Sequence, residues 1–111
     1  NSTISDSVGD LRSIPQNAQT AAYVLAATDN GKHVSITTGG VTVNSGIFSA
    51  GQVVMIFNNS SSAQTITQGT SVTMYQAGTT NTGNRTLASY GTASILCVAS
   101  NTFVISGSGL T

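Results

Sequence analysis

Apolar residues along this chain occur in short runs separated by turns rich in Gly, Asn and Ser. The longest run, VVMIF at residues 53–57, is rich in branched side chains and bounded by turn residues, which predicts a strand covered on both faces. Residues 64–68 (QTITQ) alternate strictly, with both threonines on one side and Ile66 with both glutamines on the other. Together with residues 72–75, these runs predict a three-stranded meander at the centre of the fold.

Similar runs predict further strands on both sides of this meander. They lie at residues 21–27, 33–37, 41–43, 85–89, 95–98 and 102–105. Turn residues separate them at short spacing, and no stretch shows the 3.6-residue period of an amphipathic helix. The pattern predicts an all-β fold, a compact antiparallel sandwich or barrel-like domain.

The first part of the chain differs from the rest. It holds three of the six charged residues, Asp6, Asp10 and Arg12, together with the only proline, Pro15, while apolar residues are sparse. We therefore predict an extended N-terminal arm over residues 1–20 and a β domain over residues 21–111. A disordered leader is the alternative for the same segment, because chain termini are commonly loose.

The charge content of the chain says more about its function than its length does. The 111 residues suit one domain, but only 5% are charged, against roughly a quarter in ordinary globular proteins, and the net charge is zero. Such a chain has little to attract a phosphate backbone or an anionic lipid surface, which disfavours nucleic-acid binding. No apolar run approaches the length of a membrane span. Neutral hydroxyl and amide surfaces instead favour close packing between copies of one chain.

The residues that usually carry chemistry are isolated from one another. His33 is the only histidine, and Cys97 lies in an apolar run, so no metal-ligand spacing exists. Asp6 and Asp10 lie in the segment with least predicted structure, where nothing would fix their separation or raise one pKa. We therefore predict no catalytic residue, metal or cofactor, and a protein that is not an enzyme. Arg85 either anchors a carbohydrate or a neighbouring subunit, or only adds solubility.

Several phrases of the sequence resemble a recurrent module of tailed-bacteriophage virion proteins. They are DLRSIPQNAQTAAY (residues 10–23), GGVTVNSGIFSAGQ (39–52), NNSSSAQTITQG (58–69), TGNRTLASYG (82–91) and CVASNTFVISGSGLT (97–111). In that group the module lies at or near the C-terminus of tail-fibre-like, head-fibre and decoration proteins. The resemblance implies a β-rich homotrimer on the virion surface, and no catalytic residue accompanies it.

These observations predict a structural protein on the surface of a phage particle, cementing or decorating it as a capsid decoration protein or head fibre. Its partners would be its own copies and a capsid or fibre protein, with no nucleic acid and no membrane insertion. The residues expected to bind the partner from the arm are Asp6, Asp10, Leu11, Arg12, Ile14 and Pro15.

The alternative prediction is a receptor-binding tip of a tail fibre that recognises a host surface glycan. Its recognition loop would hold Thr79, Thr80, Asn81, Asn84 and Arg85. Carbohydrate sites favour exposed aromatic platforms, and this chain has no Trp and few Tyr residues. That shortage favours a structural role over recognition.

Overall fold

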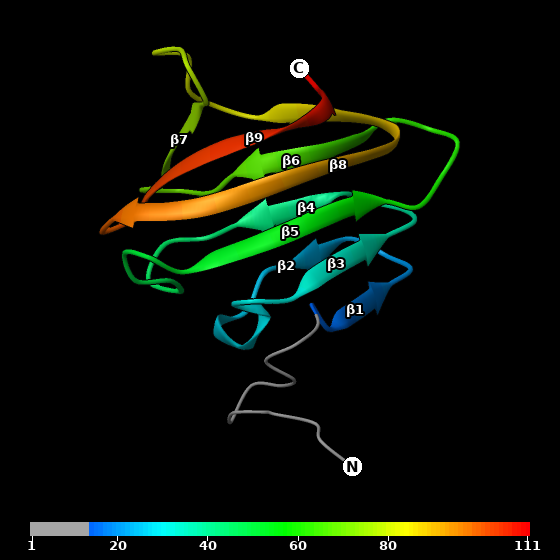
Figure 1. Ribbon diagram of the computed structural model, residues 1–111, viewed down its shortest axis with the longest axis horizontal. Coiled ribbons are helices and arrows are strands. Elements are labelled where there is room, and N and C mark those ends of the chain that lie inside the picture. The colour runs from blue at the N-terminus through cyan, green and yellow to red at the C-terminus, as the bar shows by residue number, and fades with distance from the viewer. Residues whose placement is uncertain (1–13) are drawn as a thin grey trace.

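The computed structural model describes residues 14–111, which form an all-β protein without an α-helix in that range (Figure 1). Between the second and third strands lies one short 3₁₀ turn, η1 (Ala27–Asp29). The strands are β1 (Gln16–Gln19), β2 (Tyr23–Val24), β3 (His33–Ile36), β4 (Val41–Val43), β5 (Val53–Asn58), β6 (Gln64–Gln68), β7 (Thr73–Gln76), β8 (Arg85–Ala99) and β9 (Thr102–Leu110). No helix long and apolar enough to span a bilayer occurs in these described residues.

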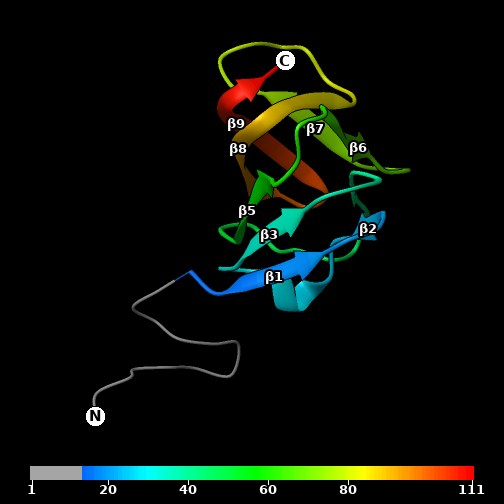
Figure 2. The ribbon, with the colours of Figure 1, turned by 90° about the vertical axis from the view of Figure 1, so that its right-hand side faces the viewer.

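The first six strands form three stacked rungs, each with one strand in a first layer and one in a second layer (Figures 1 and 2). In the first layer β1, β3 and β5 pair side by side in parallel. In the second layer β2, β4 and β6 do the same. Parallel neighbours require a crossover rather than a hairpin, and here the chain crosses over by running through the opposite layer.

The long strand β8 joins the two layers. Its second half pairs antiparallel with β5, and its first residues pair antiparallel with β6. Between these halves the register with β9 shifts, and Tyr90 adopts a left-handed backbone with φ of 57°. Such an irregularity bends a strand, so the sheet folds over and becomes nearly closed and barrel-like. β9 returns along β8, and β7 pairs in parallel with β9.

One continuous core lies between the layers and takes alternate side chains from the facing strands. The rings of Phe48 and Phe103 meet edge to face there, with centroids 6.0 Å apart. Each fully buried large side chain contributes about 1.5–3 kcal/mol to folding. The largest of these are Leu25, Val34, Ile36, Val41, Val43, Ile56, Ile66, Met74, Leu87, Ile95, Phe103 and Ile105.

The all-β, barrel-like prediction is confirmed, but the prediction of an antiparallel sheet was wrong. Five strand pairings are parallel, and only the pairings of β8 with β5, β6 and β9 are antiparallel. The Gly-Gly turn after β3 is not a hairpin but a corner that leads into the other layer. A Cβ on Gly40 would lie 2.3 Å from the carbonyl oxygen of Thr65, so this corner requires glycine.

The meander expected over residues 53–75 does not form either. β5 and β6 lie in different layers and each pairs with β8, while β7 pairs with β9. The strand pattern itself was right: Gln64 and Ile66 are buried and Thr65 is exposed, as the alternation predicted. Alternation fixes which side of a strand faces the core, but it does not specify the neighbouring strand.

The predicted arm over residues 1–20 falls partly within the described residues. Residues 16–19 are strand β1 and belong to the sheet through their parallel pairing with β3. His33 contacts the residues just before β1, because its backbone N–H donates to the carbonyl of Pro15 at 2.9 Å. Its ring Nδ1 donates to the carbonyl of Ile14 at 3.0 Å. Asp6, Asp10, Leu11 and Arg12 lie outside the described residues.

Candidate functional site

A row of apolar side chains lies on the outside of the sheet, across the adjacent strands β5, β8, β9 and β7. Val53 on β5 is paired with Leu96 on β8, Leu96 with Val104 on β9, and Val104 with Tyr75 on β7. Directly paired residues share one face of a sheet. Val53, Leu96 and Tyr75 are 37%, 40% and 36% exposed, and Val98 beside them is 45% exposed.

The same face continues along β5 and the bend of β8. Met55 and Phe57 follow Val53 at alternate positions and are half-buried, and the ring of Phe57 lies 6.4 Å from that of Tyr90. Tyr90 is the most exposed of the large apolar side chains, at 61%. We call this surface the outer face, made up of Val53, Met55, Phe57, Tyr75, Tyr90, Leu96, Val98 and Val104.

None of the eight residues of the outer face is charged, but Lys32 borders this face, because it lines a small recess together with Val53 and Met55. Its remaining cross-strand positions on β8 and β9 are small hydroxyl residues, Thr92 and Ser94 facing Ser108 and Ser106. A partner that covers these eight residues would displace water from apolar groups and hydroxyls, and would meet the Lys32 charge only at the border. The partner must therefore match this surface mainly in shape and apolar character.

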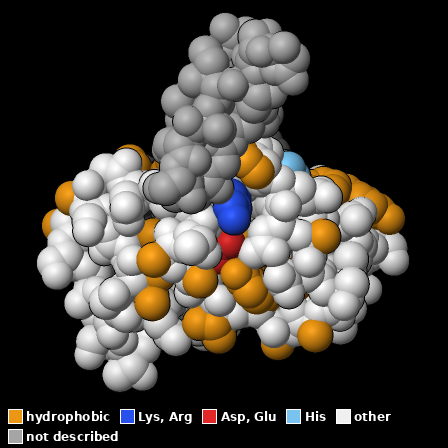
Figure 3. Space-filling model, turned by 90° about the horizontal axis from the view of Figure 1, so that it is seen from below, with side chains coloured by type: hydrophobic (Ala, Val, Ile, Leu, Met, Phe, Trp, Pro, Cys, Tyr) orange, Lys and Arg blue, Asp and Glu red, His pale blue; other side chains and the backbone are white. Residues whose placement is uncertain are grey.

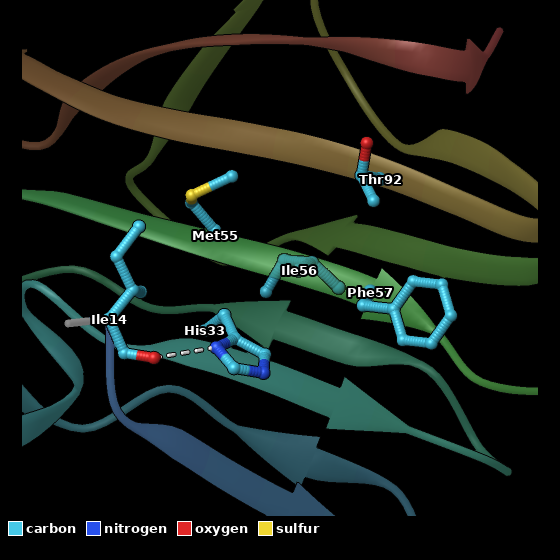
Figure 4. A pocket seen from close by; sticks show the side chains of 6 residues that line it. All are labelled: Ile14, His33, Met55, Ile56, Phe57 and Thr92. Carbon is cyan, nitrogen blue, oxygen red and sulfur yellow. Dashed lines mark hydrogen bonds between the residues drawn. The ribbon is translucent and has the colours of Figure 1, made fainter.

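A shallow pocket of about 260 Å³ opens beside the outer face (Figure 4). Its walls are mostly apolar, with the His33 ring and the Thr92 hydroxyl as the only polar side chains among the six that line it. Small-molecule sites usually measure about 300–1,000 Å³ and enclose their ligand. This smaller, open pocket suits an apolar side chain of a protein partner. Its lining residues are Ile14, His33, Met55, Ile56, Phe57 and Thr92.

Comparisons with protein-family models, curated proteins and solved structures found no match to this chain. The resemblance to phage virion modules therefore rests on the sequence phrases alone. A function has to be argued from the surface and its chemistry.

The arm residues that the structure describes lie beside the outer face. Ile14 is exposed and lines the pocket, and Pro15 leads from it into β1. The carbonyls of both residues accept hydrogen bonds from His33, which fixes where this end of the predicted arm meets the sheet. The chain before Ile14 thus joins the β domain at the rim of the pocket.

The five residues of the predicted recognition loop divide into two groups. Thr79, Thr80 and Asn81 are exposed at the tip of a projecting loop after β7 (Figure 1). Asn84 and Arg85 brace its base instead. The side-chain carbonyl of Asn84 accepts the N–H of Gln68, and the Arg85 guanidinium donates to Gln76 Oε1 at 2.9 Å and to the Asn84 carbonyl at 2.8 Å. Arg85 therefore holds the loop in place through bonds within the chain.

Asp29, which is a buried carboxylate at the base of the sheet, was not singled out by the sequence analysis. Asp29 is 1% exposed and accepts three hydrogen bonds. The donors are Asn17 Nδ2 at 2.8 Å, the Tyr23 hydroxyl at 2.7 Å and the Ala26 N–H at 2.8 Å. The carboxylate thus ties β1, β2 and η1 together. With its bonding capacity used by these donors, it serves structure rather than catalysis.

The residues with reactive or ligating side chains do not gather into a site. Among residues 14–111, no three His, Cys, Asp or Glu side chains come together as metal ligands. Cys97 is buried in β8, where its thiol donates to the Ala99 carbonyl at 3.2 Å. The outer face is therefore the candidate functional site. Sequence reasoning did not single it out because the run at residues 53–57 was expected to be covered on both faces.

The Tyr23–Asp29 hydrogen bond gives the first prediction. Burial, and then the hydrogen bond to Asp29, raise the pKa of Tyr23 above its ordinary value of 10.0. A raised pKa in the folded state contributes stability that is complete below pH 10 and lost as pH rises through the folded-state pKa. We expect Tyr23→Phe to be less stable at neutral pH and to lose less stability between pH 9 and 11 than the wild type.

Urea unfolding at several pH values tests this expectation, with Tyr90→Phe as the control. Tyr90 is exposed and makes no hydrogen bond to a carboxylate within the described residues, so its removal should leave the pH slope of the wild type unchanged. Parallel slopes for the wild type and Tyr23→Phe would contradict the role assigned to this pair.

Proposed function

We propose that this protein is a structural component of the surface of a tailed-phage virion. In this proposal it cements or decorates the particle, as a capsid decoration protein or head fibre does, through a homotrimeric β domain and the arm that precedes Ile14. The virion location and the trimeric state in this proposal come from the resemblance of the sequence phrases. The outer face supplies an independent physical argument for self-association.

The observation that carries the proposal is that, within residues 14–111, β5 is fully covered on one face only. An apolar run such as residues 53–57 is typical of a strand buried on both sides, yet the outer side chains of β5, β8 and β9 remain in contact with solvent. A contiguous exposed apolar patch on a soluble protein marks an interaction surface.

A second copy of this chain is the occupant that fits the outer face. A partner with a strong charge would gain little from the eight uncharged residues of this face, and would lose hydration of its own ions. The chain itself has 5% charged residues, so its copies approach without appreciable repulsion. The pocket beside Phe57 then offers a recess for an apolar side chain of the neighbouring copy, of the kind that anchors an interface.

Recognition of a host surface glycan stays the alternative function. The exposed loop tip at Thr79, Thr80 and Asn81 supports it, because hydroxyl and amide groups suit a sugar. Arg85 contributes less than the sequence pattern indicated, since two of its donor groups are engaged at the base of the loop.

Self-association is tested by Leu96→Asp, which places a carboxylate at the centre of the outer face. Burying an unpaired charge in an interface costs about 2–5 kcal/mol, so the dissociation constant should rise at least about 30-fold. We expect the wild type to sediment as a trimer at micromolar concentration and Leu96→Asp to sediment as a monomer with an unchanged fold.

Thr65→Asp is the matched control, because it introduces the same carboxylate at an exposed position on the second layer. It should remain trimeric. A monomeric wild type, or equal dissociation of the two variants, would remove the physical basis for self-association.

The location is tested by antibody-gold labelling of purified phage particles that carry the protein. Label spread over the head, and lost when the protein carries Leu96→Asp, is the expected result. Label confined to the tail tip and unaffected by this substitution would favour the receptor-binding alternative.

A further inference from the structure

The two ends of the folded sheet differ in how their strand edges are covered. At the β7 end the following loop turns back along the strand, with an isolated bridge between Tyr75 and Thr82 and a bond from the Gln76 N–H to the Asn81 carbonyl at 2.9 Å. At the opposite end, β1 pairs on one side with β3, and no segment of residues 14–111 pairs with its other side. The stack of rungs is therefore closed at one end and open at the other.

The backbone of β1 directs free groups toward this open edge. The N–H groups of β3 and its flank donate to the carbonyls of Pro15 and Gln19, so these positions face β3. Backbone groups point to opposite sides at successive residues of a strand, which places the N–H and C=O groups of Gln16 and Ala18 on the open side. Both residues are exposed.

β2 repeats this arrangement in the second layer. The N–H of Tyr23 donates to the Gly40 carbonyl at 3.1 Å, and that of Leu25 donates to the Thr42 carbonyl at 3.0 Å. Val24, between them, therefore directs its backbone groups toward the open side, and its side chain is exposed as well. Among the described residues, the two strands of the first rung thus present an edge that has no pairing partner.

Within residues 14–111, this edge lacks the charged strand residues and the bulges that protect many edge strands. Edge strands are usually blocked by charged side chains, by bulges or by a covering loop. No residue of β1 or β2 is charged, and neither strand contains a bulge. Seen from this end, the visible part of the described surface shows one basic and one acidic patch (Figure 3). The acid is Asp29, the only acidic residue in the described range, and it is already satisfied by donors within the chain.

We propose that this edge accepts a further rung of the same kind, an extended segment whose two strands are uncharged and run parallel to β1 and β2. The module would then be the end cap of a parallel β-stack. A parallel rung is the occupant that fits this edge, because strands of successive rungs already pair in parallel four times in this fold. The cap has a direction: β8 and β9 close the far end with antiparallel pairings, so the stack grows only beyond β1.

This inference is independent of the outer face. A rung added below β1 would extend the edge of the sheet, whereas a copy on the outer face would cover side chains of β5, β8 and β9. A trimer could therefore fail to form while the edge still accepts a rung, and the reverse also holds.

The test is to duplicate the first rung within the full chain, inserting a second copy of residues 14–32 between Ser13 and Ile14. The added strand should pair with β1 as β1 pairs with β3. The amide protons of Gln16 and Ala18 in the original rung should then exchange at least about tenfold more slowly than in the unmodified protein. Hydrogen exchange followed by NMR measures this directly, and an insert of the same composition in scrambled order is the control.

Three outcomes would overturn the proposal. Unchanged exchange at Ala18 in the duplicated chain would show that the edge does not accept a parallel rung, and equal protection by the scrambled insert would show that the effect is not strand pairing. Slow exchange at Ala18 in the unmodified protein at all concentrations would assign the edge to another segment of the same chain. Slow exchange that appears only as the concentration rises would assign the edge to a second copy.

Discussion

Replacing Asn58 by alanine is expected to lower the free energy of unfolding by about 3 kcal/mol, because it removes the donor from one buried and two partly buried carbonyls. Asn58 is fully buried at the end of β5. Its Nδ2 lies within hydrogen-bond distance of the carbonyls of Ser62 at 2.8 Å, Leu87 at 3.0 Å and Ala88 at 3.0 Å, which share its two N–H groups. One amide therefore connects the turn after β5 with the start of the bend in β8.

The effect should be large because Asn58 lies where the two layers join. β8 changes its neighbour from β6 to β5 within a few residues of Leu87, and the interrupted ladder there relies on side-chain donors. Alanine removes these donors and provides no compensating contact, so the loss is not offset by burial of new apolar surface.

Urea unfolding followed by circular dichroism measures the change, with Asn59→Ala as the control. Asn59 is exposed, and the bond it makes to Ile36 uses its backbone N–H, which alanine retains. The control should stay within about 0.5 kcal/mol of the wild type. Equal losses in the two variants would mean that the Asn58 amide does not hold the bend.

The sequence allowed several strands to be predicted because their signal is local. It missed β1, which was predicted as part of the arm, and it divided β8 into two strands at residues 85–89 and 95–98. Alternating burial at residues 64–68 and the apolar run at residues 53–57 place β6 and β5 within a residue of their observed limits. Strand partners depend instead on where each turn sends the chain. Turns that pass from one layer to the other contain the same Gly, Asn and Ser residues as hairpin turns, so the parallel rungs resembled an antiparallel meander.

The candidate site was only partly accessible from sequence for a related reason. The apolar run at residues 53–57 predicts that these side chains are shielded from water. It does not predict whether both faces of the strand are covered by this chain or one of them by a partner. Loop residues such as Thr79 and Arg85 were noticed for their composition, yet Arg85 turned out to be engaged at the loop base. Asp29 was hidden because its donors, Asn17 and Tyr23, come from two strands that the pattern did not bring together.

The second large effect is expected at Gly107 in β9, which lies against the backbone of β8. A Cβ at this position would lie 1.9 Å from the carbonyl oxygen of Thr92 and 2.6 Å from the Cα of Ala93. Gly107→Ala should therefore lower the free energy of unfolding by about 3 kcal/mol or more, since overpacking against fixed atoms forces the backbone to move.

The contacted atoms cannot yield easily, because β8 is paired with β5 on one edge and with β9 on the other at this point. Urea unfolding of Gly107→Ala beside Ser108→Ala tests the argument. Ser108 is the neighbouring exposed residue and already carries a Cβ, so its truncation should change stability by less than about 0.5 kcal/mol. Comparable stability of the two variants would show that β9 can move away from β8.

Gly107 also connects the packing of the fold to the outer face. Val104 on β9 and Leu96 on β8 are adjacent members of the apolar row, and their alignment depends on the register that Gly107 allows. If β9 is pushed away from β8, Gly107→Ala should weaken self-association even under conditions in which most molecules remain folded. Sedimentation of this variant well below its unfolding midpoint would show a reduced trimer fraction, whereas Ser108→Ala would assemble as the wild type does. An unaltered trimer fraction in Gly107→Ala would mean that the apolar row does not need this alignment to bind a second copy.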